Sequence, residues 1–264
     1  MSFSITLQEN IQGHAIYDNP NVYAGDINGN PVTPKAGVPC YLWAKPQNTG
    51  TESASAVNVS FFICIPSPQP VWPQSAHGSA ALSTLAAGQI ASLFCSVPWV
   101  PDSSYGSHQC LVAVVSCLDC PAPPTPPGQQ VNPYNTQTAM HNVFLFMLQA
   151  GLQTVERNFD VINAPVAGRL VMTRVPLAAR AATLQSLGVD PNLPEAPPHD
   201  KFGIVDKADG SDKGTTLTIQ AGDNYSLHAA VEVNNTSPGT AAFYQVEQFE
   251  GDTSLGGVSF IILQ

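Results

Sequence analysis

Prolines and glycines interrupt this chain at short intervals. Its 264 residues include 24 prolines and 20 glycines, and the segments between them are about as long as a β-strand. Many of these segments alternate apolar and polar residues, which is the periodicity of a strand with one buried face. The sequence therefore predicts an all-β fold of short strands joined by turns.

The first half of the chain shows the alternation clearly. In residues 37–45, one face carries Val38, Cys40, Leu42 and Ala44. Further strands are predicted over residues 56–65, over residues 109–116 and within 140–149, with proline-rich loops at 66–73 and 117–133. Residues 78–97 fit either one helix or two strands, 80–85 and 90–97. The turn-like sequence at 86–89 favours two strands.

The second half repeats this organisation with one exception. Residues 177–187 are rich in alanine, leucine and arginine, and this composition predicts a short helix. Strands are predicted over residues 153–162, 168–175, 215–219, 225–233, 241–249 and 257–263. The simplest division is into two β-domains of similar size, 1–149 and 150–264.

The low content of charged residues and the negative net charge indicate which kinds of partner the protein can bind. Charged residues make up only 11% of the chain, against roughly 25% in an average soluble domain, so neutral polar residues must cover the surface. Such a surface is typical of extracellular, adhesive and virion proteins. The formal net charge is −10, with nine lysines and arginines and no basic run, which argues against binding to nucleic acid or to an anionic membrane.

Targeting signals are not evident in the sequence. The first residues lack the basic and apolar regions of a secretory leader, and the apolar run at 143–148 is too short to span a bilayer. We therefore expect a protein without a membrane span that stays in the cytoplasm, leaves by a route without a cleavable leader, or forms part of a particle.

Several segments resemble a known family of β-sandwich modules. In the first half these are residues 35–51, 56–61, 85–89, 97–101 and 108–113, and in the second half 244–251 and 255–260. They are similar to strands of bacterial CARDB-type domains and other bacterial immunoglobulin-like domains, which are related to cell adhesion. The resemblance implies two tandem immunoglobulin-like β-sandwiches. It carries no catalytic residues.

The immunoglobulin-like framework also implies a position for a disulfide. Cys40 and Cys110 correspond to the places where the two facing sheets of such a sandwich are often cross-linked. The alternative is that both are reduced, buried thiols packed as small apolar groups.

A second pair of cysteines has the spacing Cys117-Leu-Asp-Cys120. Zinc would need two further ligands, but Cys110 lies at the other end of the strand that precedes Cys117, roughly 20 Å away at the rise of an extended chain. We therefore expect no metal site here. A local disulfide between Cys117 and Cys120 and a pair of free thiols remain as alternatives.

Catalytic patterns are missing from the sequence. There is no nucleophile elbow, phosphate-binding loop or dinucleotide-binding glycine pattern, and the six histidines are scattered. Residues 26–30 and 206–212 gather oxygen ligands as calcium loops do, but their spacing fits turns better. We expect no enzyme activity and no cofactor.

The remaining candidates for binding are aromatic. Trp72 stands between prolines and is the better candidate for exposure, Trp43 faces away from Cys40 on its strand, and Tyr134 follows a proline-rich loop. The leading prediction is a non-catalytic structural or interaction protein. It would form a homo-oligomer or a larger assembly through sheet edges and proline-rich loops, as an adhesive, filament, particle or virion component. The alternative is a carbohydrate- or receptor-binding module that uses Trp72, Trp43 and Tyr134.

Overall fold

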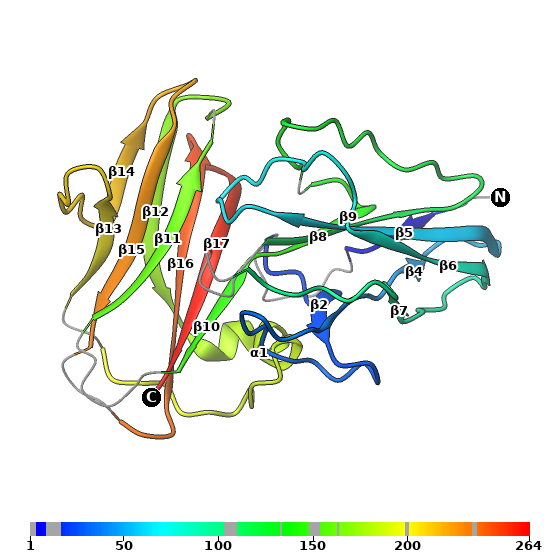
Figure 1. Cartoon of the computed structure of the whole chain (residues 1–264), viewed down its shortest axis with the longest axis horizontal. Helices are drawn as coiled ribbons and strands as arrows, with labels where there is room; N and C mark the ends of the chain where they lie inside the picture. Colours follow the sequence, from blue (N-terminus) through cyan, green and yellow to red (C-terminus); the bar gives the residue numbers. More distant parts are fainter. Residues whose placement is uncertain are drawn as a thin grey trace. The chain divides into compact units, whose positions relative to one another are not determined.

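The computed structural model describes residues 4–8, 17–102, 110–132, 134–147, 154–162, 164–198, 201–233 and 237–264. Within these ranges the protein is all-β, as predicted, apart from the 3-10 helix η2 (Leu177–Arg180) and helix α1 (Ala181–Ser186) (Figure 1). These two elements confirm the helix predicted over residues 177–187. Neither described helix is long and apolar enough to cross a membrane.

The chain forms two compact units, and neither is continuous in sequence. The first contains Met1–Cys64, Val71–His141 and Ala182–Val189, and the second contains Ile65–Pro70, Asn142–Ala181 and Asp190–Gln264. The division predicted between residues 149 and 150 lies outside the described residues.

The described residues of the first unit form three antiparallel sheets. A four-stranded sheet has the order β6-β5-β8-β9, a three-stranded sheet has the order β2-β3-β7, and β1 pairs with β4. The strands are β1 (Ile5–Thr6), β2 (Val22–Gly25), β3 (Tyr41–Ala44), β4 (Gln47–Asn48), β5 (Ala54–Cys64), β6 (Gly78–Leu85), β7 (Leu93–Phe94), β8 (Cys110–Ser116) and β9 (Thr138–His141). The choice of strands over a helix in residues 78–97 is confirmed by β6 and β7, although β7 is only two residues long.

Buried apolar side chains lie on both faces of the four-stranded sheet around β5 and β8. Alternate residues of β5 and β8, such as Val59 and Ala113, pack with Leu42 of β3 in one core cluster. Residues of opposite parity, such as Phe62 and Val112, lie in a second cluster on the other face. This two-sided burial explains why β8 is almost continuously apolar rather than alternating.

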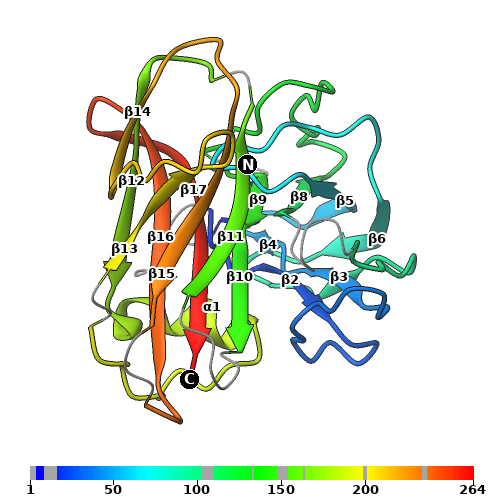
Figure 2. The ribbon, with the colours of Figure 1, turned by 60° about the vertical axis from the view of Figure 1, so that its left-hand side comes forward.

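The second unit places two sheets face to face (Figure 2). The larger has the order β10-β17-β16-β12-β14 and the smaller the order β11-β15-β13. The strands are β10 (Val143–Met147), β11 (Thr154–Val161), β12 (Gly168–Val175), β13 (Lys201–Asp206), β14 (Thr216–Ile219), β15 (Tyr225–Glu232), β16 (Ala241–Glu250) and β17 (Thr253–Leu263). Among the described strands of this unit, β10 and β17 pair in parallel and the other pairs are antiparallel.

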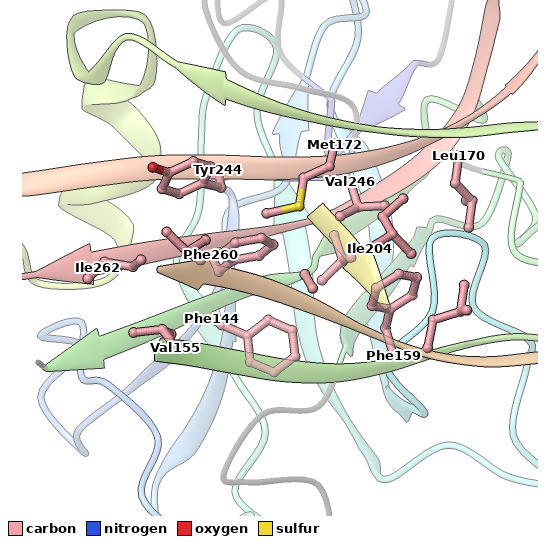
Figure 3. Close-up of a cluster of buried hydrophobic side chains, with 14 of the residues drawn as sticks. Phe144, Val155, Phe159, Leu170, Met172, Ile204, Tyr244, Val246, Phe260 and Ile262 are labelled. Atoms are coloured by element: carbon pink, nitrogen blue, oxygen red, sulfur yellow. The ribbon is translucent and has the colours of Figure 1, made fainter. Parts of the chain in front are cut away.

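Side chains from both sheets fill the space between them. Met172 and Tyr244 of the larger sheet point toward the same core as Phe159 and Ile204 of the smaller one (Figure 3). Ile204 is fully buried although β13 was not predicted from the sequence. The smaller sheet therefore closes the core from one side and leaves its other face available to solvent.

Candidate functional site

Strand β6 forms one edge of the four-stranded sheet of the first unit. One side of β6 pairs with β5 from Ala54↔Leu85 to Phe61↔Gly78. In the part of the chain that the structure describes, no strand pairs with the other side, and the backbone groups of residues 79–84 make no hydrogen bond beyond those with β5. An edge of this kind offers N–H and C=O groups that another strand can complete.

The sequence of β6 does nothing to block such pairing. Its eight residues, Gly-Ser-Ala-Ala-Leu-Ser-Thr-Leu, include no charge and no proline, and Ser79, Ala81, Ser83 and Thr84 are exposed. The other described edge strands of six residues or more are charged: β11 carries Glu156, and β13 carries Lys201 and Asp206. Charges on an edge are a common protection against association between sheets. Strand β6 lacks that protection.

A second candidate lies on the outer face of the smaller sheet in the second unit. A cavity of about 440 Å³, which we call the sheet hollow, is lined by Thr154, Glu156, Lys201, Phe202, Gly203, Val205, Gly210, Asp212, His228, Ala230 and Glu232. Gly203 and Ala230 are opposite each other on β13 and β15. Gly203 is itself covered, because a Cβ at this position would lie 3.0 Å from Gly214 O and 3.3 Å from Asp212 Oδ1, whereas Ala230 is partly accessible.

Charged and ionisable side chains surround these two small residues. Lys201 Nζ lies 3.2 Å from Asp212 Oδ2 and 3.6 Å from Glu232 Oε1. The hydrogen bond and the charge of Asp212 raise the pKa of Lys201, and Glu232 adds to this effect. The pKa of Asp212 is lowered first by the backbone N–H of Gly214 and then by Lys201. On the other side, His228 Nε2 lies 3.9 Å from Glu156 Oε1.

The hollow therefore presents both hydrogen-bond donors and acceptors around Ala230. These residues could not be recognised as a site from the sequence, because β13 was not predicted and nothing indicated that Lys201 and Gly203 lie beside β15. The strand alternation of β15 alone could have placed His228, Ala230 and Glu232 on one outward face.

The tryptophans proposed for ligand binding are buried. Trp43 stacks between Tyr23 and Phe94, with ring centroids 6.4 and 4.8 Å away, and its Nε1–H donates to the carbonyl oxygen of Asp26 at 3.0 Å. Trp72, which was expected to be exposed, has only 4% of its surface accessible.

Trp72 is covered because its loop is tied to another one. Its backbone N–H donates to Gln129 O, its carbonyl oxygen accepts from Gly128 N–H, and its ring lies edge-on to Phe62 at 5.0 Å. Of the three proposed binding aromatics, Tyr134 has an exposed side chain, at 53%.

All six cysteines are free in the structure, and Cys40 and Cys110 are not brought together. Cys40 belongs to the cluster between β3 and the four-stranded sheet, whereas Cys110 lies on the opposite face of that sheet. The residue directly across from Cys110 is Cys64, on β5. Cys117 and Cys120 do lie together, in the turn after β8.

The two oxygen-rich segments are turns, as predicted. Asp26 Oδ1 accepts hydrogen bonds from the backbone N–H groups of Asn28 and Asn30, so the loop itself satisfies this carboxylate. In the later segment, Asp206 and Asp209 pair with Lys213. Within the described ranges, no group of three or more histidine, cysteine, aspartate or glutamate side chains is placed to hold a metal ion.

Comparisons with known proteins give weak structural matches. No protein-family model matches the chain, and no curated protein sequence matches it. A protein of unknown function from Porphyromonas gingivalis W83 is 11% identical, with a TM-score of 0.24, and the match covers 93% of this chain and 97% of that one. Amycolatopsis orientalis exo-chitosanase CsxA is 9% identical with a TM-score of 0.24, over 91% of this chain and 26% of the enzyme. Red sea bream transglutaminase is 9% identical with a TM-score of 0.23, over 92% of this chain and 31% of the enzyme.

Proposed function

We propose that this chain is a non-catalytic assembly protein, built of two immunoglobulin-like sandwiches of the CARDB type, that pairs with a second copy of itself through β6. The observation that supports this proposal is the long, uncharged and proline-free edge at Gly78–Leu85. Such a protein would serve as an adhesive, filament, particle or virion component.

Self-pairing fits β6 better than pairing with a charged partner. Two copies of the strand in antiparallel orientation about a two-fold axis bring no like charges opposite each other, because the strand has none. The outward side chains are serine, alanine and threonine, which cost less to dehydrate than charged side chains and are small enough to leave the backbone groups accessible. The surface beyond β6 is also poor in charge, since charged residues are 11% of the chain.

Net charge opposes this association at long range. Each copy carries a formal charge of −10. Salt screens such repulsion over a length of about 8 Å at physiological ionic strength and about 3 Å at 1 M. We therefore expect pairing to strengthen as the salt concentration rises, whereas an assembly held by ion pairs would weaken.

The test is sedimentation velocity of the full chain over a range of concentrations, with two matched variants. Ala81→Lys places an ammonium group on the exposed edge of β6, and Ala87→Lys adds the same charge in the exposed turn after it. We expect the wild type and Ala87→Lys to form dimers or larger species and Ala81→Lys to remain monomeric. A wild type that is monomeric at every concentration, or an Ala81→Lys variant that assembles as well as Ala87→Lys, would overturn the proposal.

The alternative function is binding of a carbohydrate, and it is favoured by the sheet hollow and by Tyr134 rather than by the buried tryptophans. Paired donors and acceptors such as Lys201 and Glu232 can each form an added hydrogen bond to a neutral hydroxyl without separating. A glycan array tests this function, with Lys201→Met as the variant in the hollow and exposed Lys35→Met as its control. Array hits that Lys201→Met loses and Lys35→Met keeps would support carbohydrate binding in the sheet hollow. An array without hits would exclude this function.

A further inference from the structure

The turn that follows β8 brings two cysteines into direct contact. The backbone N–H of Cys117 donates to Cys120 O at 2.9 Å, and the N–H of Cys120 donates to Cys117 O at 3.2 Å. The side chains of the two cysteines are also hydrogen-bonded to each other. Only Leu118 and Asp119 separate them, and Leu118 is 73% exposed at the tip of the turn.

This backbone geometry suits a disulfide. Residues that exchange both backbone hydrogen bonds across an antiparallel pair have Cα atoms about 5.5 Å apart. Disulfides form at Cα separations of roughly 4.4–6.8 Å, with the side chains directed toward each other. The contact between the thiols of Cys117 and Cys120 satisfies the second condition.

Solvent access distinguishes Cys120 from the other five cysteines, which are all buried. Cys64 and Cys110 also face each other, but their exposed fractions are 2% and 0%, and Cys95 is fully buried. Cys120 is only partly buried, so a small oxidant can reach its sulfur from solvent, and Cys117 then lies next to it.

We propose that Cys117 and Cys120 form a reversible disulfide by exchange with a low-molecular-weight disulfide such as oxidised glutathione. The Cys120 thiol loses its proton to solvent, and its sulfur attacks one sulfur of the oxidant, which breaks the S–S bond and releases one thiolate. Cys117 then loses its proton and attacks the Cys120 sulfur, which forms the protein disulfide and releases the second thiolate. Two protein thiols are oxidised, and one small disulfide is reduced to two thiols.

The disulfide would fix the turn against the strands beside it. Leu118 N–H donates to Ser55 O on β5 at 2.9 Å, and the Cys120 sulfur accepts a hydrogen bond from the backbone of Ile5 on β1. The cross-link would therefore hold the end of β8 and the start of the proline-rich segment 121–127. It closes a loop of four residues, for which chain entropy predicts a roughly 20-fold lower equilibrium constant of unfolding.

The pH dependence of the exchange rate provides a further test of this proposal. Burial raises the pKa of the Cys120 thiol to about 11, and the hydrogen bond to Cys117 adds to this effect. Because the thiolate is the attacking species, the rate should rise about tenfold for each pH unit between pH 7 and 9.

The experiment uses the full chain, incubated with oxidised glutathione, then unfolded in the presence of an alkylating reagent, digested and analysed by mass spectrometry. We expect the peptide with Cys117 and Cys120 to be unlabelled and lighter by two hydrogens, while Cys64 and Cys110 become alkylated once the protein is unfolded. The Cys117→Ser variant should instead retain glutathione on Cys120, because the second thiol is missing. Alkylation of both Cys117 and Cys120 in the oxidised wild type, or accumulation of glutathione on wild-type Cys120, would overturn the proposal. This readout does not depend on β6 or on the assembly state.

Discussion

The side-chain amide of Asn142 donates to the carbonyl oxygen of Ser67 at 2.8 Å, although 75 residues separate them. The same amide nitrogen donates to Gly257 O at 2.7 Å. All three residues belong to the second unit, and Asn142 and Ser67 are buried. One asparagine thus anchors Ile65–Pro70 within a unit that otherwise begins at Asn142.

Replacing Asn142 should destabilise the protein. In Asn142→Ala the buried carbonyl oxygens of Ser67 and Gly257 lose the hydrogen bonds from this amide, which costs about 3 kcal/mol of unfolding free energy. Asn192→Ala is the control, because Asn192 is an exposed asparagine in a turn of the same unit and its loss should cost less than about 0.5 kcal/mol. Chemical denaturation followed by intrinsic fluorescence measures both. Equal losses for the two variants would contradict the anchoring role of Asn142.

Stability should fall in mild acid because of His141. This residue is buried on β9, and burial lowers the pKa of its imidazole to about 4, with only a hydrogen bond to Asn19 O acting in the opposite direction. The unfolded chain binds the proton near pH 6.5, so stability is full above that pH and is lost as the pH falls toward 4. The loss attributable to His141 is about 3 kcal/mol.

The control for this pH dependence is a second histidine. His141→Gln should remove most of the decrease in stability between pH 6.5 and 4, whereas His77→Gln, at a partly exposed site of the same unit, should leave it in place. Unfolding free energies measured at several pH values in this window decide between them. A His141→Gln profile parallel to that of the wild type would assign the pH dependence to other groups.

The sequence predicted strands well where apolar and polar residues alternate within the strand itself. Residues 168–175 alternate along one strand, and β12 covers that range without change. By contrast, β13 follows a proline-rich segment and has Lys201 and Asp206 at its ends, so its few apolar residues gave no strand signal. This segment is a strand because it pairs with β15, about 25 residues later in the chain, and such pairing cannot be read from the local sequence.

The candidate sites depend on long-range pairing even more. Nothing near Trp72 in the sequence indicates that Gln129 and Gly128 hold its backbone and bury its ring. Likewise, Cys40 and Cys110 both lie in apolar strands, but only the register of β5 against β8 decides that Cys64 is the neighbour of Cys110. The site at β6 could be predicted in part. Its uncharged composition can be read directly from residues 78–85, but its position at the edge of a sheet depends on pairing with β5, which is distant in the sequence.

Trp43 should contribute to stability rather than to ligand binding. Its ring is covered by Tyr23 and Phe94, and Gly25 lies so close to it that any side chain at that position would overlap the indole. Trp43→Ala should therefore cost about 3–5 kcal/mol of unfolding free energy. Trp43→Phe keeps an aromatic ring but loses the hydrogen bond to Asp26 O, and should cost less than half as much. A stable Trp43→Ala variant that had lost ligand binding would reverse this assignment.

The thiols of Cys64 and Cys110 should be unreactive in the native protein. Burial raises the pKa of Cys64 to about 12, and it raises that of Cys110 well above its usual value, with Cys64 adding to the shift. Since the thiolate is the species that alkylating reagents attack, both sites should stay unlabelled at pH 8 in the native state and react fully in denaturant. Cys120 serves as the internal control: its pKa is also raised, to about 11, but its side chain is partly accessible, whereas Cys64 and Cys110 are closed to the reagent, so Cys120 should react before unfolding. A Cys40–Cys110 disulfide would leave both of these cysteines unlabelled even in denaturant until a reductant was added, so the same experiment tests the cross-link that the immunoglobulin-like framework implies.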